Sequence, residues 1–93
     1  MDFLDIAGKT FLIFGVANRK SIAFSIGQVL SEANANVIYS IRSKERRESV
    51  CRILPGADIY VCDVEREQEI QKLAGDISEK YHKIHGIVHS IAF

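Results

Sequence analysis

Gly15 and Ser21, six positions apart, are the residues of this chain whose types and spacing most clearly indicate chemistry. They separate an apolar run, residues 10–14, from a stretch of helical periodicity that begins at Ile22. A strand, a glycine turn and a helix N-terminus in this order form a site for a phosphate group, because unpaired backbone N–H groups and the positive end of the helix dipole meet there. The spacing differs from the G-x-G-x-x-G fingerprint of dinucleotide-binding turns. The turn by itself therefore predicts either a phosphate site or an ordinary corner with a serine cap.

The histidines and cysteines of the chain predict no further site. His82, His85 and His89 are closely spaced, but no Cys, Asp or Glu lies among them in a ligand pattern. A helix end, a turn and a strand would have to aim three rings at one point, so we expect no metal and interpret His89 as a structural residue of a strand. Cys51 and Cys62 are expected to be reduced and buried as small hydrophobes, because the sequence shows no secretory signal.

The elements that must position these residues follow from the hydrophobic pattern. Short apolar runs predict strands, and stretches with apolar residues at helical spacing predict the segments between them. The predicted strands are residues 10–14, 36–41, 58–62 and 87–93, and the predicted helices begin at Ser21, Ser43 and Asp63 and end near Asn34, Leu54 and Lys83. This β-α-β-α-β-α-β alternation predicts an α/β fold, a Rossmann-like doubly wound parallel sheet of strand order 3-2-1-4, with residues 1–93 in a single domain.

Composition restricts the classes of partner. The chain has 93 residues, of which 47% are hydrophobic and 26% charged, as in a folded globular protein. Twelve basic and twelve acidic residues cancel, and no Lys/Arg stripe dominates a face, so we expect neither a nucleic-acid nor a membrane partner. The first residues carry Asp2 and Asp5 where a signal peptide carries Lys or Arg, and no apolar run approaches the ~20 residues of a membrane span. We therefore expect a cytoplasmic protein.

The predicted topology brings the polar residues to one edge of the sheet. In an open α/β sheet, ligands bind outside the carboxyl ends of the strands, where the strand order reverses. That point lies here between the first and fourth strands, and the segments at this edge are residues 15–21, 41–44, 62–64 and 90–93. The edge favours a nucleotide cofactor, although some doubly wound sheets bind none.

Three segments that reach this edge closely resemble the bacterial enoyl-acyl-carrier-protein reductases, a branch of the short-chain dehydrogenase/reductase superfamily. They are GVANRKSIA (residues 15–23), CDV (62–64) and HGIVHSIAF (85–93), and the resemblance extends in order and spacing through all 93 residues. The serine-isoleucine-alanine step, where other members of the superfamily carry glycines, makes the match specific. The resemblance implies that the turn after the first strand binds the pyrophosphate and nicotinamide ribose of NADH or NADPH.

The resemblance also implies roles for individual residues. The residues expected to line the phosphates and ribose are Gly15, Val16, Ser21 and Ile22, and those expected to border the nicotinamide are Ser90, Ile91 and Ala92. Asp63 is expected to hydrogen-bond the adenine amino group and Val64 to pack beside the ring, with a helix cap and a core position as their alternative roles.

The choice between the two cofactors depends on the end of the second strand. NAD-specific folds usually place Asp or Glu there, and such a carboxylate repels a 2′-phosphate. This chain has Arg42 at that position, followed by Lys44 and Arg46, which predicts that NADPH is accepted at least as well as NADH. The alternative is a solvated helix start in which Glu45 and Glu48 offset the basic residues.

The family reduces the double bond of an enoyl thioester on acyl carrier protein, with a tyrosine of a Tyr-x6-Lys pattern stabilising the enolate. Seven positions after the three tyrosines of this chain stand Arg46, Glu67 and Val88, so we assign no catalytic residue. We expect the chain to be the N-terminal part of the dinucleotide-binding domain of a reductase, inactive alone and, by resemblance, a homotetramer when intact. The alternative is a truncated or regulatory nucleotide-binding module without activity.

Overall fold

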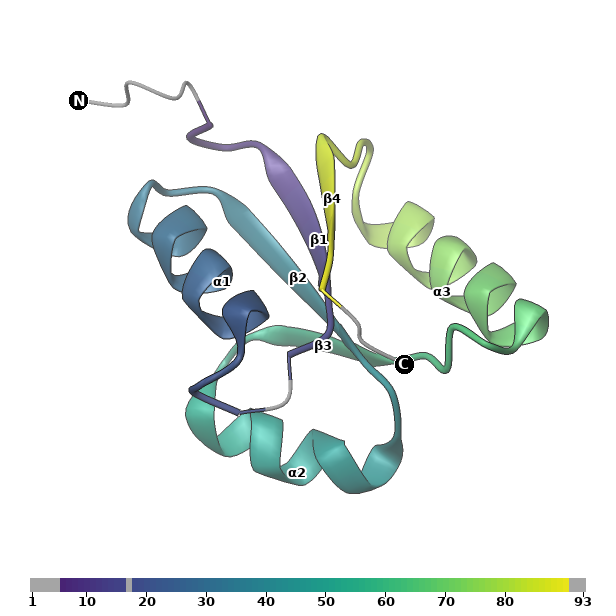
Figure 1. The fold of residues 1–93 in the computed structure, drawn as a ribbon. Helices are drawn as coiled ribbons and strands as arrows, with labels where there is room; N and C mark the ends of the chain where they lie inside the picture. The colour runs from purple at the N-terminus through teal and green to yellow at the C-terminus, as the bar shows by residue number, and fades with distance from the viewer. Residues whose placement is uncertain (1–5, 17, 91–93) are drawn as a thin grey trace.

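The structure, a computed structural model, describes residues 6–16 and 18–90 as a parallel sheet with helices on both faces (Figure 1). The elements are β1 (Thr10–Phe14), α1 (Ile22–Glu32), β2 (Asn36–Ile41), α2 (Lys44–Ile53), β3 (Asp58–Val61), α3 (Glu67–Lys80) and β4 (Gly86–His89). The order of the four strands in this part of the chain is β3-β2-β1-β4, and all pairs are parallel. The predicted fold class and strand order are confirmed.

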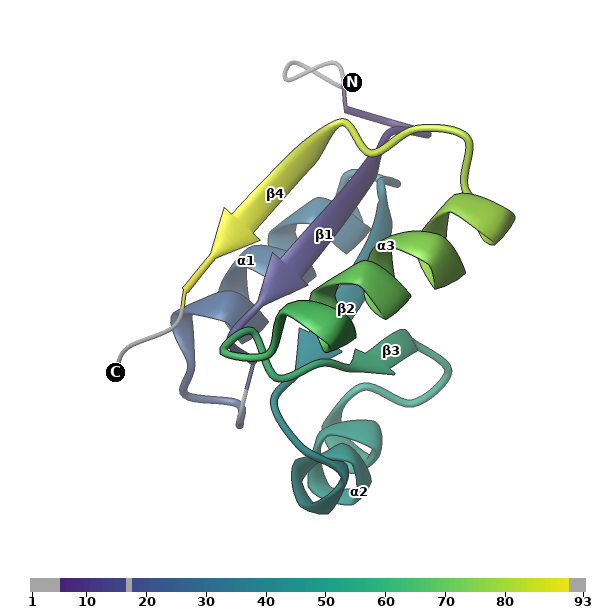
Figure 2. The same cartoon turned by 90° about the vertical axis from the view of Figure 1, so that its right-hand side faces the viewer.

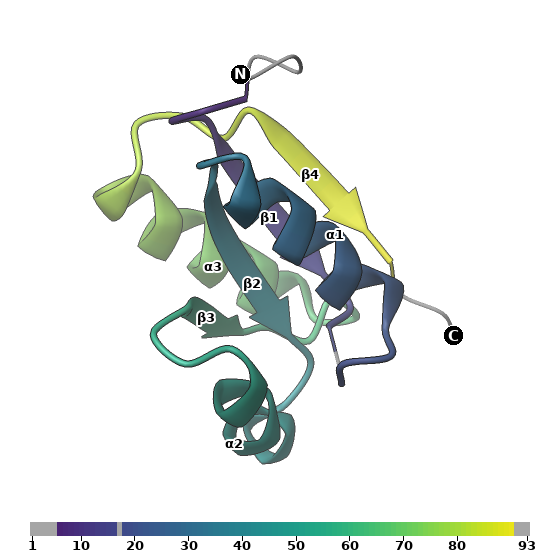
Figure 3. The ribbon, with the colours of Figure 1, turned by 90° about the vertical axis from the view of Figure 1, so that its left-hand side faces the viewer.

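The sheet separates two hydrophobic clusters. Helices α1 and α2 cover one face (Figure 3), where Ile13, Tyr39 and Val50 belong to a single buried cluster. Helix α3 covers the other face (Figure 2), where Leu12 and Ile38 pack with residues of α3. Strand β2 lies between β1 and β3 and is covered on both faces, which is why its sequence NVIYSI is almost continuously apolar rather than alternating.

Helix α1 begins and ends where the sequence predicts. The Ser21 hydroxyl accepts the Phe24 N–H at 3.2 Å, so Ser21 is the N-cap. Past the end of the helix, Asn34 adopts a left-handed backbone with φ of 67°, a conformation that Asn tolerates better than most residues and that terminates the helix. These two local signals fix the length of α1.

The predicted start and end of α3 are wrong. Asp63 was expected as its N-cap, but the helix begins at Glu67, and the Asp63 carboxylate instead accepts the Glu65 N–H at 3.0 Å in a local turn. The helix ends at Lys80, so His82 and Lys83 follow it rather than complete it. An aspartate can cap a helix or close a turn, and here the turn delays the helix.

Smaller differences affect α2, β3 and β4. Ser43 occupies the N-cap position of α2, but its side chain makes no capping hydrogen bond. Strand β3 ends at Val61 rather than at Cys62, although the Cys62 N–H still donates to the Ile41 carbonyl at 2.8 Å. Strand β4 begins at Gly86, one residue before its predicted start, and ends at His89; Ser90 follows the strand, and residues 91–93 of the predicted range lie outside the described residues.

Several apolar residues of the helices are exposed. Cys51 is exposed on α2, contrary to expectation, whereas Cys62 is buried, and both are free thiols. Ile22 and Val29 lie on the apolar stripe of α1, yet 69% and 57% of their surfaces are exposed. The spacing of apolar residues identifies an apolar stripe on a helix, but it does not predict what covers that stripe.

Within the described residues, no helix combines the length and apolar character that crossing a bilayer requires.

Candidate functional site

The turn after β1 leaves the carboxyl edge of the sheet at Gly15. Its φ of 103° is a backbone conformation that L side chains rarely adopt, so glycine is required by the path of the chain. Val16 is only 3% exposed and its side chain belongs to the core under α1 and α2, which leaves its backbone alone available to a ligand.

The second half of the turn is organised by Asn18, which the sequence analysis did not identify. Its side-chain oxygen accepts the Lys20 N–H at 2.8 Å, and its carbonyl accepts both the Ser21 N–H at 3.1 Å and the Ser21 hydroxyl at 2.7 Å. Asn side chains commonly close turns by bonding to backbone two residues further on, and this is the signal that would have identified the residue.

The N-terminus of α1 offers donors for an anion. Because the Ser21 hydroxyl accepts the Phe24 N–H and donates to Asn18, it serves the turn and the cap. The Ile22 and Ala23 N–H groups, the first two of the helix, find no acceptor among the described residues. Two free N–H groups at the positive end of the helix dipole suit a pyrophosphate, so the residues present fit a dinucleotide.

The end of β4 lies beside this turn. Phe14 pairs with His89 in the register of β1 and β4, and the Ser90 N–H donates to the Phe14 carbonyl at 3.1 Å. In the sheet, strand β1 lies between β2 and β4, so the strand order reverses at this point. Gly15, Ser21 and Ser90 are thus brought to one edge, as predicted. Ile91 and Ala92 lie outside the described residues.

The ends of β2 and β3 carry the other predicted residues. Arg42 follows Ile41 directly and is exposed. Asp63 and Val64 are half-buried after β3, and Val64 packs against the cluster under α3. Because parallel strands end at the same edge, these residues share the edge with Gly15.

Glu69 supports the Asp63 segment, and no sequence pattern indicated it. Its carboxylate accepts the Asp63 N–H at 3.0 Å, which ties the first turns of α3 to the chain leaving β3. Burial raises the pKa of the neighbouring Cys62 thiol, and the negative charges of Glu69 and Asp63 raise it further. Cys62 is therefore a neutral thiol at neutral pH, consistent with a structural rather than a reactive residue.

His89 and His85 lie at opposite edges of the sheet and contact different residues. The His89 ring lies 6.1 Å from the Phe14 ring, centroid to centroid. His85 is at the opposite edge, where its Nδ1 accepts the Thr10 N–H at 3.0 Å. Over residues 6–16 and 18–90, no three His, Cys, Asp or Glu side chains are grouped in a way that could hold a metal ion.

A parallel sheet of order 3-2-1-4 with a glycine turn at its switch point defines a Rossmann-like α/β protein. The chain belongs to the enoyl-(acyl carrier protein) reductase family, whose family model matches residues 15–93.

Named relatives agree with this membership. The chain is 33% identical over 95 residues to the NADPH enoyl-acyl-carrier-protein reductase FabI of Staphylococcus aureus, covering 97% of this chain and 37% of that protein. It is 36% identical over 93 residues to the NADH enzyme FabI of Bacillus subtilis, covering 95% of this chain and 36% of that protein. The crystal structure of the NADH enoyl-acyl-carrier-protein reductase of Aquifex aeolicus VF5 superposes with a TM-score of 0.89 at 31% identity, covering 95% of this chain and 36% of that one. The chain thus spans a little over a third of the length of these relatives.

Proposed function

We propose that the protein containing this chain reduces the 2,3 double bond of enoyl-acyl-carrier-protein with NADH or NADPH, and that these residues supply part of its cofactor site. The observation that carries the proposal is the end of β1 and the start of α1, where Gly15 and two helix N–H groups without an acceptor among the described residues lie at the switch point of the sheet. Relatives named as NADPH and NADH enzymes support either cofactor.

The turn would hold the phosphates through backbone. The Ile22 and Ala23 N–H groups donate to the pyrophosphate, and the absence of a side chain at Gly15 lets the backbone approach it. The Ser21 hydroxyl is engaged with Asn18 and Phe24, so its role is to fix the donors in place rather than to serve as the main ligand. Ser90 borders the nicotinamide half, and we assign Ile91 and Ala92 to the same border.

The other strand ends would hold the adenosine half. One Asp63 oxygen accepts the Glu65 N–H, which leaves the second oxygen to accept a hydrogen bond from the adenine amino group. Val64 offers an apolar contact to the ring. Arg42, exposed directly after β2, is positioned in the sequence to pair with a 2′-phosphate.

The nicotinamide, when bound, supplies the hydride that is added to the β-carbon of the substrate. The negative charge that develops on the thioester oxygen then needs a donor, a contribution typically worth several kcal/mol. The tyrosines of this chain serve other purposes: the Tyr81 hydroxyl donates to Asp58 at 2.5 Å, Tyr39 is 2% exposed in the core, and Tyr60 packs against the cluster under α3. We therefore propose that the catalytic tyrosine and lysine come from outside these residues.

We also propose, on family membership alone, that the intact protein is cytoplasmic and assembles as a homotetramer. Light scattering of the full-length protein tests the assembly, and a mass of one or two subunits would contradict it.

Oxidation of NADH and NADPH in the presence of crotonyl-acyl-carrier-protein tests the proposed activity, followed by nicotinamide absorbance. We expect turnover by the full-length protein and none by residues 1–93 alone. Turnover by residues 1–93 would refute the assignment of catalysis to residues outside them. Cofactor binding by the full-length protein without turnover would instead favour a nucleotide-binding regulatory module.

A further inference from the structure

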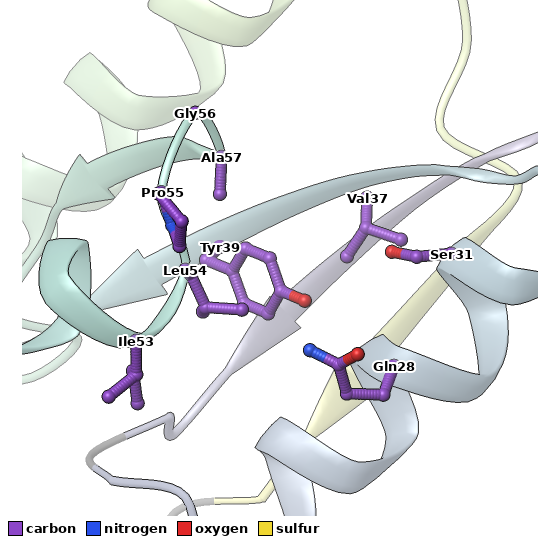
Figure 4. A pocket seen from close by; sticks show the side chains of 9 residues that line it. All are labelled: Gln28, Ser31, Val37, Tyr39, Ile53, Leu54, Pro55, Gly56 and Ala57. Atoms are coloured by element: carbon purple, nitrogen blue, oxygen red, sulfur yellow. The ribbon is translucent and has the colours of Figure 1, made fainter.

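A second candidate site lies on the face of the sheet that α1 and α2 cover. Here the structure has a cavity of about 300 Å³ between the last turns of α1, strand β2 and the turn that joins α2 to β3 (Figure 4). Its lining residues are Gln28, Ser31, Val37, Tyr39, Ile53, Leu54, Pro55, Gly56 and Ala57. A cavity of this volume is at the small end of ligand sites, so it suits a molecule with a single ring.

Hydrogen-bonding groups line the α1 side of this cavity. The Tyr39 hydroxyl points toward α1, where the Ser31 hydroxyl and the Gln28 amide extend from the helix (Figure 4). Burial raises the pKa of the Tyr39 phenol, and a hydrogen bond with the Ser31 side chain offsets part of the increase. The phenol is therefore neutral and, with the amide and the serine, can both donate and accept hydrogen bonds.

The absence of a side chain at Gly27 leaves the space that the Tyr39 ring occupies. A Cβ at Gly27 would lie within 3 Å of the Tyr39 phenol, because the ring lies directly against the backbone of α1. Any side chain at position 27 would push the phenol out of its place. The small residue on the helix and the large one on the strand are thus matched, and together they fix the polar wall of the cavity.

The opposite wall is apolar. Ile53 ends α2, Leu54 follows it, and Ala57 comes from the turn before β3, whereas the apolar Val37 of β2 lies beside Ser31 (Figure 4). No Asp, Glu, Lys or Arg is among the lining residues. A charged ligand would therefore find no ion partner among the lining residues, whereas a neutral ligand needs none, so the pocket favours neutral molecules.

The cavity is separate from the proposed cofactor site. Gln28 and Ser31 lie in the last turns of α1, whereas the phosphate donors lie at its first turn. No lining residue belongs to the set assigned to the cofactor. Occupation of the cavity therefore leaves the carboxyl edge of the sheet free.

We propose that this cavity binds a small neutral aromatic molecule bearing one hydroxyl, of the phenol class. The ring lies against Leu54 and Val37, and the hydroxyl exchanges hydrogen bonds with the cluster of Gln28, Ser31 and Tyr39. The combination of one polar wall and one apolar wall matches a ligand with one polar end and one apolar end.

NMR of the full-length protein with labelled Ile, Leu and Val methyl groups tests the proposal, with p-cresol as the probe. We expect saturable shifts of the Val37, Ile53 and Leu54 methyls, and none of Leu73 and Ile77, which lie on the other face of the sheet. Toluene, which lacks the hydroxyl, should bind at least threefold more weakly, and benzoate and benzylamine should not bind. Equal affinity for toluene and p-cresol, or shifts spread over both faces, would overturn the proposal.

Variants test whether p-cresol binds in this cavity or elsewhere on the surface. Ala57→Leu fills the cavity and should raise the Kd of p-cresol at least tenfold, whereas Ala74→Leu, the same change at an exposed position of α3, should leave it unchanged. Ser31→Ala, at an exposed helix position, should raise the Kd of p-cresol at least threefold and leave the Kd of toluene unchanged. Unchanged p-cresol binding in both Ala57→Leu and Ser31→Ala would refute the site.

Discussion

At the scale of single residues, Gly15 carries the strongest constraint in the candidate cofactor site. Its φ of 103° suits only glycine, and in the proposed function the backbone there approaches a phosphate. Gly15→Val in the full-length protein should therefore abolish measurable cofactor binding, whereas the strained backbone should lower the free energy of unfolding by only about 1–3 kcal/mol. Calorimetric titration with NADH and NADPH measures the first effect, and urea denaturation measures the second.

Gly75→Val is the matched control, because a Cβ at Gly75 in α3 meets no other atom within 4 Å. It should leave cofactor affinity unchanged. If Gly15→Val also leaves the affinity unchanged, the phosphates bind elsewhere.

Arg42 is the residue that we expect to set the preference between the two cofactors. It is exposed directly after β2, where a carboxylate would select NADH. Arg42→Ala should lower kcat/KM for NADPH about 10- to 150-fold, the equivalent of a charge-assisted hydrogen bond of roughly 1.5 to 3 kcal/mol, and should affect NADH less. Arg52→Ala, at an exposed position at the other end of α2, is the control and should change neither value. An equal loss for both cofactors in Arg42→Ala would show that Arg42 does not contact the 2′-phosphate.

At the scale of elements, His85 joins the amino ends of β1 and β4. The Thr10 N–H donates to His85 Nδ1 at 3.0 Å, and the His85 N–H donates to the Thr10 carbonyl at 2.8 Å. Thr10 is only 5% exposed, so removal of the acceptor leaves a buried N–H unpaired. His85→Ala should therefore lower the free energy of unfolding by about 1–3 kcal/mol, measured by urea denaturation.

His85→Asn supplies an acceptor two bonds beyond Cβ, as Nδ1 does, and should recover part of this stability. His82→Ala, at an exposed position after α3, is the control and should have little effect. Equal destabilisation by His85→Ala and His85→Asn would mean that the ring's packing, not its acceptor, stabilises the pair of strands.

The elements also show which features a sequence can specify. Apolar runs and the Ser21 cap predicted the order of strands and helices and the start of α1, because these signals are local. The start of α3 was missed because Asp63 closes a turn with Glu65, an alternative that competes with capping over the same few residues. The contact of Glu69 with the Asp63 backbone depends on how α3 returns toward β3, and no pattern of residue types encodes it.

At the scale of the whole molecule, the candidate site is assembled from the ends of four strands, and its residues are proposed from the family resemblance. Topology then explains their proximity: parallel strands of order 3-2-1-4 bring Gly15, Arg42, Asp63 and Ser90 to one edge. The cavity beside Tyr39 could not be anticipated in this way. It depends on the fit of the Tyr39 ring against Gly27, which involves the volume of two side-chain positions rather than a motif.

The two outer strands of the described sheet differ in how they are protected. Strand β3 begins with Asp58, which pairs with Lys80 at 3.2 Å, and charged residues of α2 and α3 flank it. Strand β4 has the sequence GIVH, without Asp, Glu, Lys or Arg, and Ile87 is 65% exposed. Natural edge strands are commonly protected from pairing by charges, so β4 is the edge open to association.

Residues 1–93 expressed alone should therefore self-associate through β4. Exposed backbone groups beside a bare apolar side chain favour pairing with a second copy. Analytical ultracentrifugation should show dimers or larger species that increase with concentration. Ile87→Lys should shift this equilibrium toward monomer, because a charge on an edge strand opposes pairing, whereas Ile70→Lys, at a 43% exposed position of α3, should not. A clean monomer at high concentration, or equal effects of the two substitutions, would show that β4 does not mediate association.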